Sequence, residues 1–525
     1  MTLTKNDGYE RKVVFLFLHL QQNLSHERYS VFYFALQINA QSTLVFSKQY
    51  NFGNSYNQLS FSVFNYGNDY LLTGLTSSTS SNFGGIGIIR SDSAGNQKWQ
   101  KQSFGHTGYR YANNTGGQMF IKLKNGNLLF TGEYVIATNY HRAVLARINQ
   151  NNGDTLWVKE YIQAGDTCNL QCCSEQSDSS IIVLGYKYYA SLTASIVATP
   201  FIMKIDKNGN YKWHKYLMSP VNYEPFYQKI FRINDNDFIA IGINFYDANN
   251  YQSSIIKLDT SANISYNVGT AGVNYSFLYD LIKLQDGNFL AAGVYWSYHN
   301  SSTGATKYRK LFYKFDGLTG AKLNERRYNW EANVNGVLSI QQQFDGSIIA
   351  MGGTGYITPI NTYNAEADIF KLSSNLDSVR TTYIGDGILQ NQKACSSFIL
   401  TPDGGFALAM QLYPSPGQQK FWLIKTDSLG CDSANCAATT GVSDTNFKNE
   451  LIKSYPNPTS RILYISSIDI ELSDSQIEIR NTLGETVFKT PFKKEIDVSQ
   501  FVNGCYFITI TNKEKQRFHS KFIKE

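Results

Sequence analysis

Residues 286–293, Asp-Gly-Asn-Phe-Leu-Ala-Ala-Gly, contain the pattern that decides the fold: a tight polar turn, a short apolar strand and a final glycine. Asp-Gly favours a hairpin, because Asp and Gly both tolerate the positive φ of a type I′ turn. The strand is apolar at every position, which is typical of a strand buried on both faces. A glycine at its end permits close approach of another backbone. The stretch therefore predicts the second strand of an antiparallel unit.

The same unit occurs seven times along the chain. Its strand ends seven positions after the turn's reference residue, and six of the seven endpoints are Gly; the segments are 67–74, 125–132, 178–185, 235–242, 286–293, 345–352 and 403–410. Successive endpoints are 58, 53, 57, 51, 59 and 58 residues apart, with a mean of 56. A period of this length in a strand-rich chain predicts a β-propeller, here with seven blades.

A second motif follows, about 20 to 30 residues after the first in each unit. Residues 92–99 and 206–213 share Asp-x-x-Gly-x-x-x-Trp, and residues 150–157 differ only at the first position. We interpret it as the turn between the third and fourth strands. The repeated Trp favours an aromatic wedge between neighbouring sheets rather than a ligand site. Later units replace the Trp with Tyr266, Asn324, Arg380 and Ala434.

The N-terminal strand is predicted to close the ring. Residues 46–53 match residues 99–105, which are a fourth strand, but no first, second or third strand precedes them. The last unit has those three strands and loses the pattern of the fourth after Gly430. We therefore expect residues 44–50 to form the outer strand of the seventh blade, which removes an exposed sheet edge.

The composition supports an all-β protein and excludes several classes. The 36 Tyr, 33 Phe and 40 Gly against 10 Pro suit strands joined by tight turns. A net charge of +6 without a Lys/Arg cluster excludes a nucleic-acid footprint. No apolar run reaches about 18 residues, so we expect no transmembrane helix.

The first 40 residues resemble a leader. Two apolar stretches, residues 13–20 and 29–36, each follow a basic residue, and the second leads to Ala40, a small residue suited to cleavage. We predict a signal peptide at residues 1–40. The alternatives are a poorly ordered extension and a start codon downstream of Met1.

The chain has seven cysteines. Cys431 and Cys436 are close enough to close a small loop, and export would allow this disulfide. Cys172 and Cys173 are adjacent, and a vicinal disulfide in a propeller resembles quinone-cofactor dehydrogenases. The calcium site and catalytic Asp of those enzymes cannot be assembled here, so a staple from Cys168 or buried thiols are the preferred alternatives. We predict no cofactor and no metal site.

A separate domain is predicted after a polar linker at residues 437–450. Residues 451–525 hold about seven short strand patterns, which indicate a small Ig-like β-sandwich. They also hold an ordered set of motifs: Tyr455-Pro456-Asn457-Pro458, a turn at Gly484, Gly504-x-Tyr506-Phe and a basic last strand with Lys521.

These motifs resemble the type A C-terminal sorting domain of the Bacteroidota type IX (Por) secretion system. Cys505 stands where Val or Ile is more usual, and Glu525 ends a tail that is usually basic. The resemblance implies a partner, the secretion machinery, and a secreted or cell-surface location. It implies nothing about activity. The propeller, residues 41–436, resembles quinoprotein-like and delta-60-type repeats.

Two function hypotheses remain open. The first is a non-catalytic propeller that binds a glycan, polymer or protein; the second is a hydrolase or quinone-dependent oxidoreductase whose site no motif reveals. The absence of known catalytic motifs favours binding. In a four-stranded blade, the short turns share one face and the long loops share the other, and aromatic residues in polar loops suit recognition. The candidate ligand-binding residues on the long-loop face are Tyr109, Tyr111, Tyr140, Tyr188, Tyr223, Tyr295, Trp296 and Trp330.

Overall fold

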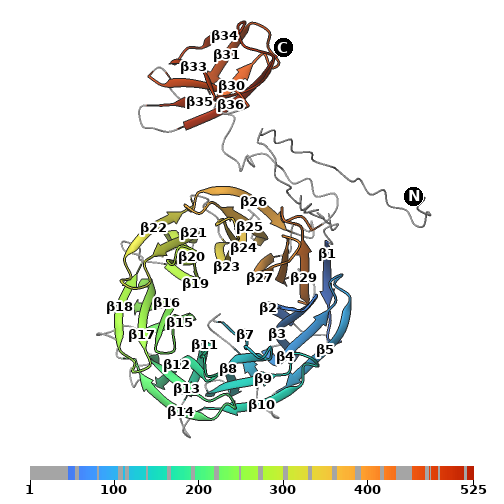
Figure 1. The fold of residues 1–525 in the computed structure, drawn as a ribbon, viewed down its shortest axis with the longest axis vertical. Helices are drawn as coiled ribbons and strands as arrows, with labels where there is room; N and C mark the ends of the chain where they lie inside the picture. Colours follow the sequence, from blue (N-terminus) through green and yellow to red (C-terminus); the bar gives the residue numbers. More distant parts are fainter. Residues whose placement is uncertain are drawn as a thin grey trace, which may run out of the picture. The chain divides into compact units, whose positions relative to one another are not determined.

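Consecutive repeats fold into consecutive sheets, and each sheet is one blade of a ring (Figure 1). The chain divides into two compact units, residues 1–42 and 43–525, and every described residue belongs to the second. The predicted signal peptide and linker lie outside the described residues. The computed structural model describes residues 45–53, 58–79, 82–104, 110–112, 118–137, 140–161, 167–190, 196–217, 224–247, 250–269, 276–299, 306–328, 334–357, 363–384, 392–413, 419–432, 452–467, 472, 474–482, 485–512 and 517–525.

Each blade is an antiparallel meander of four strands, ordered from the centre of the ring outward (Figure 1). Blade 1 contains β2 (Gln58–Tyr66), β3 (Asp69–Thr79), β4 (Asn82–Ser91) and β5 (Gln97–Phe104). Blade 2 contains β6 (Arg110–Ala112) and β7 (Phe120–Lys122) as a divided inner strand, then β8 (Leu128–Ala137), β9 (Tyr140–Ile148) and β10 (Thr155–Glu160). Blade 3 contains β11 (Thr167–Glu175), β12 (Ile181–Ala190), β13 (Ile196–Ile205) and β14 (Tyr211–Tyr216). Blade 4 contains β15 (Glu224–Arg232), β16 (Asp237–Asp247), β17 (Asn250–Asp259) and β18 (Ile264–Gly269).

The remaining blades repeat this order. Blade 5 contains β19 (Ser276–Lys283), β20 (Phe289–His299), β21 (Thr306–Phe315) and β22 (Lys322–Arg327). Blade 6 contains β23 (Val334–Gln342), β24 (Ile348–Ile357), β25 (Tyr363–Leu372) and β26 (Ser378–Ile384). Blade 7 contains β27 (Gln392–Leu400), β28 (Phe406–Tyr413), β29 (Phe421–Thr426) and β1 (Phe46–Tyr50). The predicted seven-bladed propeller is thus confirmed.

The closing strand lies where the sequence predicted it. β1 pairs antiparallel with β29, with Phe46 opposite Lys425 and Tyr50 opposite Phe421. The side chains of Phe46 and Tyr50 are buried, and the Tyr50 hydroxyl donates to the Gly95 carbonyl of blade 1 at 2.8 Å. The two ends of the repeat region therefore share one blade.

In blades 1, 3, 4, 5 and 6 the repeated glycine of the second strand faces a β-bulge in the inner strand, and the strand continues beyond this glycine rather than ending at it. In blade 5, Leu278 pairs with Gly293 and Asp280 with Ala292, so Tyr279 is the extra residue. The bulge pushes the Phe277 carbonyl against Gly293, where a Cβ would overlap the oxygen. The same carbonyl contact occurs at Gly74, Gly185, Gly242 and Gly352.

The predicted type I′ turn is wrong in detail. At the 286–287 turn, only Gly287 has a positive φ, of 87°. The Gly287 N–H donates to the Leu284 carbonyl at 3.0 Å, and the Leu284 N–H donates to the Asn288 carbonyl at 2.8 Å. The Asp286 carboxylate accepts the Asn288 N–H at 3.0 Å. Asp thus stabilises the turn by an Asx contact rather than by adopting positive φ.

Four aromatic residues of the fourth strands are wedges between blades, as predicted for the repeated Trp. A Cβ built on Gly153 would lie 2.8 Å from the Trp99 ring, and a Cβ built on Gly209 would lie 2.9 Å from the Trp157 ring. Each ring therefore rests on the turn glycine of the next blade. Phe46 on Gly95 and Tyr266 on Gly320 repeat the contact.

The C-terminal segment forms two sheets of three and four strands around one core. The strands are β30 (Ile452–Tyr455), β31 (Ile462–Ser467), β32 (Gln476–Arg480), β33 (Thr486–Pro491), β34 (Glu495–Asp497), β35 (Gly504–Thr511) and β36 (Arg517–Lys524). These seven strands in two sheets confirm the predicted small β-sandwich. Tyr506 is buried in its core and stacks on Phe522, with ring centroids 5.3 Å apart.

Candidate functional site

Three of the eight predicted ligand-binding residues on the long-loop face have side chains within the described part of the chain. Tyr109, Tyr223 and Trp330 lie outside the described residues. Tyr140 begins β9 and Tyr188 lies in β12, but their side chains are also outside the described part. The structure describes the side chains of Tyr111, Tyr295 and Trp296.

Tyr111 is a core residue, so the prediction that it binds a ligand on the long-loop face is wrong. Its side chain is 1% exposed and packs edge-on against Phe130, with centroids 5.4 Å apart. Its hydroxyl accepts a hydrogen bond from the Tyr134 hydroxyl at 2.9 Å. Burial raises the pKa of both phenols. The sequence placed it in a polar loop, whereas it lies in the inner strand β6.

Trp296 belongs to an aromatic cluster at the long-loop end of blade 5. Its ring centroid lies 5.8 Å from that of Phe277 and 5.6 Å from that of Tyr308, the latter ring being nearly perpendicular. Phe277 stacks on Tyr279 with centroids 6.4 Å apart, and burial raises the pKa of Tyr279 to about 12. We call Phe277, Tyr279, Trp296 and Tyr308 the blade 5 cluster.

Tyr295 faces the other side of the same sheet, because successive side chains of a strand alternate. It packs beside the core shared with blade 4, and the Arg327 guanidinium lies 4.7 Å from its ring centroid. Tyr295 and Trp296 therefore do not form one platform. Phe277 and Tyr308 take the place beside Trp296, and strand alternation was the signal that would have found them.

The structure also has a pocket on the opposite, short-turn face, where the sequence predicted no site. Its volume is about 510 Å³. Two turns and two strands of blade 3 line it: the β11–β12 turn, the β13–β14 turn, β13 and β14. The lining residues are Asp178, Ser180, Lys204, Asp206, Lys207, Lys212 and Trp213.

Both carboxylates of this pocket are held by their own turns. Asp178 accepts the Ser180 hydroxyl at 2.5 Å and the Ser180 N–H at 2.9 Å, and these bonds lower the pKa of Asp178. Asp206 accepts the N–H groups of Asn210 and Asn208, which lower the pKa of Asp206 to about 2. Both groups are ionised at neutral pH, so neither serves as a general acid.

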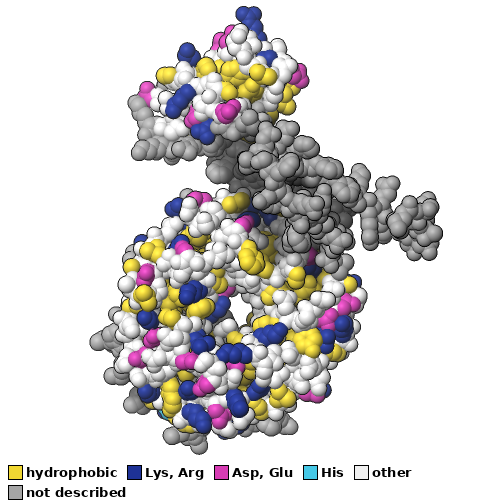
Figure 2. All heavy atoms as spheres, viewed as in Figure 1, with side chains coloured by type: hydrophobic (Ala, Val, Ile, Leu, Met, Phe, Trp, Pro, Cys, Tyr) yellow, Lys and Arg dark blue, Asp and Glu magenta, His cyan; other side chains and the backbone are white. Residues whose placement is uncertain are grey.

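The lysines of the pocket are less firmly engaged. Lys204 Nζ lies 3.7 Å from Asp178 Oδ2, and Lys212 Nζ lies 3.6 Å from Asp206 Oδ2. Both distances exceed those of a direct charge-assisted hydrogen bond. The Lys207 side chain is exposed, and its ammonium forms no ion pair with the described residues. Figure 2 shows Lys and Arg side chains beside Asp and Glu on the face of the ring turned toward the viewer.

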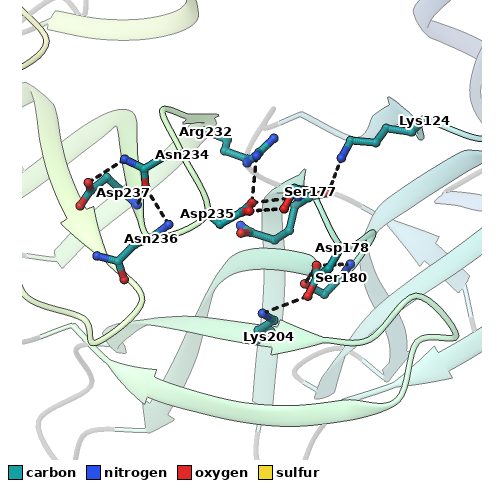
Figure 3. A network of polar contacts seen from close by, with 11 residues as sticks. Lys124, Ser177, Asp178, Ser180, Lys204, Arg232, Asn234, Asp235, Asn236 and Asp237 are labelled. Atoms are coloured by element: carbon teal, nitrogen blue, oxygen red, sulfur yellow. Dashed lines mark hydrogen bonds and ion pairs between the residues drawn. The ribbon is translucent and has the colours of Figure 1, made fainter.

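Polar contacts connect the first turns of blades 2, 3 and 4 near this pocket (Figure 3). The Lys124 ammonium donates to the Gln176 carbonyl at 2.6 Å. The Ser177 N–H donates to Asp235 Oδ1 at 2.8 Å, and the Ser177 hydroxyl donates to the same carboxylate. Arg232 forms an ion pair with Asp235 at 2.9 Å. These contacts set the relative positions of the three turns.

The cysteines do not form the vicinal disulfide. Cys172 and Cys173 are both free and buried, and they pack into the cores on opposite sides of blade 3. Burial raises the pKa of the Cys173 thiol to about 12 and that of Cys172 well above its ordinary value. Cys168 is also buried and forms no disulfide with either of them, so the buried-thiol alternative is correct. Cys431 is disulfide-bonded; Cys436, its predicted partner, lies outside the described residues, so that pairing stays a prediction.

Neither a metal-binding cluster nor a membrane-spanning helix occurs among the described residues. No group of three or more His, Cys, Asp or Glu side chains in this part of the chain could hold a metal ion. Likewise, no helix in the described ranges is long and apolar enough to cross a membrane.

The predicted sorting motifs mostly lie in the described sandwich. Asn457 accepts the Ile523 N–H at 2.9 Å and donates to the Lys521 carbonyl at 3.2 Å, which joins the opening motif to the last strand. The Tyr455 and Tyr464 rings stack with centroids 5.8 Å apart. Of the remaining motif residues, Pro456, Pro458, Gly504 and the exposed Lys521 are described, and Gly484 is not.

Residues 453–525 match the family model of the secretion system C-terminal sorting domain. The tail is a Por secretion sorting domain. A sorting domain implies that its cargo contacts the secretion machinery and is exported to the outer-membrane surface or the extracellular space. This agrees with the location and the partner expected from the sequence.

The solved structures that resemble the chain are distant. A protein of unknown function from Bacteroides caccae is 13% identical with a TM-score of 0.36, covering 62% of this chain and 97% of its own. A protein of unknown function from Dyadobacter fermentans is 8% identical with a TM-score of 0.40, covering 61% and 94%. A quinohemoprotein alcohol dehydrogenase from Pseudomonas putida is 8% identical with a TM-score of 0.37, covering 73% and 75%. A search of the curated proteins finds no match. None of these likenesses informs the function.

Proposed function

We propose that the propeller is a non-catalytic extracellular binding module whose ligand is a glycan, bound on the long-loop face beside blade 5. The observation that carries this proposal is the blade 5 cluster, in which the Trp296 ring lies 5.8 Å from that of Phe277 and 5.6 Å from that of Tyr308, centroid to centroid. Aromatic faces and edges grouped in this way suit the apolar faces of sugar rings. The sorting domain supports an extracellular ligand, because the cargo is exported.

The cluster lies on a rigid support. Trp296 and Tyr308 are directly opposite each other on β20 and β21, and Phe277 is on the neighbouring inner strand β19. Backbone pairing therefore holds the three rings before any ligand arrives, which reduces the entropy lost on binding. All three side chains are partly exposed, so their rings are accessible to a ligand.

The test is a glycan array with the exported protein, followed by titration of each bound glycan against the variants Trp296→Ala and Tyr308→Ala. We expect each variant to weaken binding about tenfold, because aromatic residues at the centre of a binding surface contribute most of the affinity. Tyr383→Ala is the matched control, since Tyr383 is 48% exposed on the outer strand of blade 6.

Two results would reject this function. One is that no glycan binds. The other is that binding persists unchanged in Trp296→Ala and Tyr308→Ala. Turnover of an array glycan by the wild-type protein would show the alternative function, an enzyme with a site no motif reveals.

A further inference from the structure

Trp213 is an exception among the wedge residues. Trp99, Trp157, Tyr266 and Phe46 each rest on a turn glycine of the following blade. The turn that follows Trp213, between β17 and β18, instead places Ala262 at the glycine position, with a φ of 68°. At the other four turns, a Cβ built on the glycine would lie only 2.5 to 2.9 Å from the aromatic ring, so those contacts leave no room for the methyl group that Ala262 carries.

The pocket lies at this exception. Trp213 and Ala262 pack beside the same core, and Trp213 also forms one wall of the 510 Å³ pocket. At blades 1 and 2 the corresponding indole N–H groups, of Trp99 and Trp157, are buried without a partner among the described residues. We infer that Ala262 prevents Trp213 from seating on the turn and so keeps the pocket open. The volume is within the range of about 300 to 1,000 Å³ typical of ligand sites.

The charges of the pocket favour an anion. Lys204, Lys207 and Lys212 contribute three ammonium groups against two carboxylates. Asp178 and Asp206 have donors from their own turns, whereas Lys204 and Lys212 contact them only at 3.7 and 3.6 Å. The ammonium groups can therefore donate to a ligand without breaking a close ion pair.

We propose that this pocket binds an anionic saccharide, with the Trp213 ring against a sugar face and the lysines on its carboxylate or sulfate groups. A fourth ammonium, that of Lys215, lies 5.4 Å from the centroid of the Trp213 ring and adds to the positive potential. The flat Trp213 ring suits the apolar face of such a sugar, and the surrounding lysine ammonium groups suit its charged groups. The site lies on the opposite face from the blade 5 cluster, so it does not depend on the function proposed above.

The experiment is calorimetric titration of the exported protein with three probes: alginate oligosaccharides, sulfated carrageenan oligosaccharides and neutral laminarin oligosaccharides. We expect binding of at least one anionic probe, weaker binding at higher salt and none of the neutral probe. Comparison of the two anionic probes distinguishes carboxylate from sulfate recognition.

Three variants test the residues. Trp213→Ala and the double variant Lys207→Ala/Lys212→Ala remove the wall and two donors, and each should weaken binding about tenfold. Ala262→Gly removes the Cβ, lets Trp213 seat on the turn and should weaken binding to a similar extent. Because glycine suits a φ of 68° better than alanine, this third variant keeps the test valid even if Trp213→Ala fails to fold.

A matched control comes from another blade. Lys98→Ala removes the lysine at the same motif position in blade 1 as Lys212 in blade 3. This variant should bind as the wild type does. The proposal is overturned if neither anionic probe binds, or if Trp213→Ala, the double-lysine variant or Ala262→Gly binds with wild-type affinity. Loss of binding in Trp296→Ala alone would place the ligand on the long-loop face and overturn it as well.

Discussion

At the residue scale, two kinds of glycine serve different purposes in this chain. Gly293 faces a bulged carbonyl, that of Phe277, and has no room for a Cβ. Gly287 sits in a turn with a φ of 87° and has no atom within 4 Å of a built Cβ. The first is required by crowding between strands and the second by backbone conformation.

Gly293→Ala should therefore be the more damaging substitution. We expect it to lower the free energy of unfolding by about 3 kcal/mol, because the inner strand must shift to accommodate the methyl group. Gly287→Ala should cost about 1 kcal/mol, the penalty of a left-handed conformation alone. Denaturant titration of both variants measures the difference, and equal losses would contradict the crowding at Gly293.

At the element scale, the turns of the short-turn face are stabilised by ionised carboxylates. The Ser177 hydroxyl and N–H of the neighbouring blade lower the pKa of Asp235, and the Ser180 hydroxyl and N–H lower the pKa of Asp178. A folded-state pKa below the unfolded value, about 3.9, stabilises the fold above pH 4, and that stability is lost as the pH falls through the folded-state pKa.

Ser177→Ala should therefore reduce the acid sensitivity of the fold. Without the hydroxyl, the pKa of Asp235 rises toward its unfolded value, so the loss of stability between pH 6 and pH 3 becomes smaller. Ser261→Ala is the control, since Ser261 donates its backbone N–H to Asp259 at 2.8 Å and the substitution keeps that bond. Denaturant titrations at pH 6 and pH 3 measure the free energy of unfolding at each pH. If Ser177→Ala loses as much stability between the two pH values as the wild type does, the Ser177 hydroxyl does not stabilise the ionised form of Asp235.

At the scale of the whole molecule, the ring depends on a strand from the start of the repeat region. β1 completes blade 7 through five residue pairs with β29 and buries Phe46 and Tyr50. The Trp422 indole N–H donates to the Ser47 hydroxyl at 2.9 Å across the same pairing. Without β1, β29 would present an open edge and blade 1 would lose a neighbour.

A variant that lacks residues 1–50 should be less stable than one that lacks residues 1–42. Exposure of two buried aromatic side chains and of an edge strand should cost about 5 kcal/mol. A synthetic peptide of residues 43–53 should restore part of that loss when added in excess. Equal melting temperatures of the two truncated variants would show that β1 does not close the ring.

Much of the propeller could be predicted because its determinants are local and repeated. The spacing of Asp286 and Gly293, and its recurrence, specifies a turn and a buried strand wherever it occurs. The wedge role of Trp99 and Trp157 followed from repetition too. The turn type could not be predicted in detail, because Asp-Gly suits both a type I′ turn and the observed one, in which only Gly287 has a positive φ.

The candidate sites were less predictable. Tyr111 was assigned to a surface because its neighbours are polar, but the inner strand of blade 2 buries it. The partners of Trp296 come from two other strands, and the pocket residue Trp213 packs beside the same core as Ala262 of the next blade. Such contacts join residues that are tens of positions apart, so no local pattern contains them.

The sequence by itself determined the number of blades, the strand that closes the ring, the sandwich and its sorting motifs. Each of these follows from periodicity, turn chemistry or an ordered motif within a short stretch of chain. The tertiary structure alone decided that Cys172 and Cys173 separate into two cores and that Trp213, of the aromatic wedges, faces a turn alanine. The physical reason is that a blade interface pairs residues of different repeats, and whether a ring seats or leaves a pocket depends on one Cβ in the neighbouring blade.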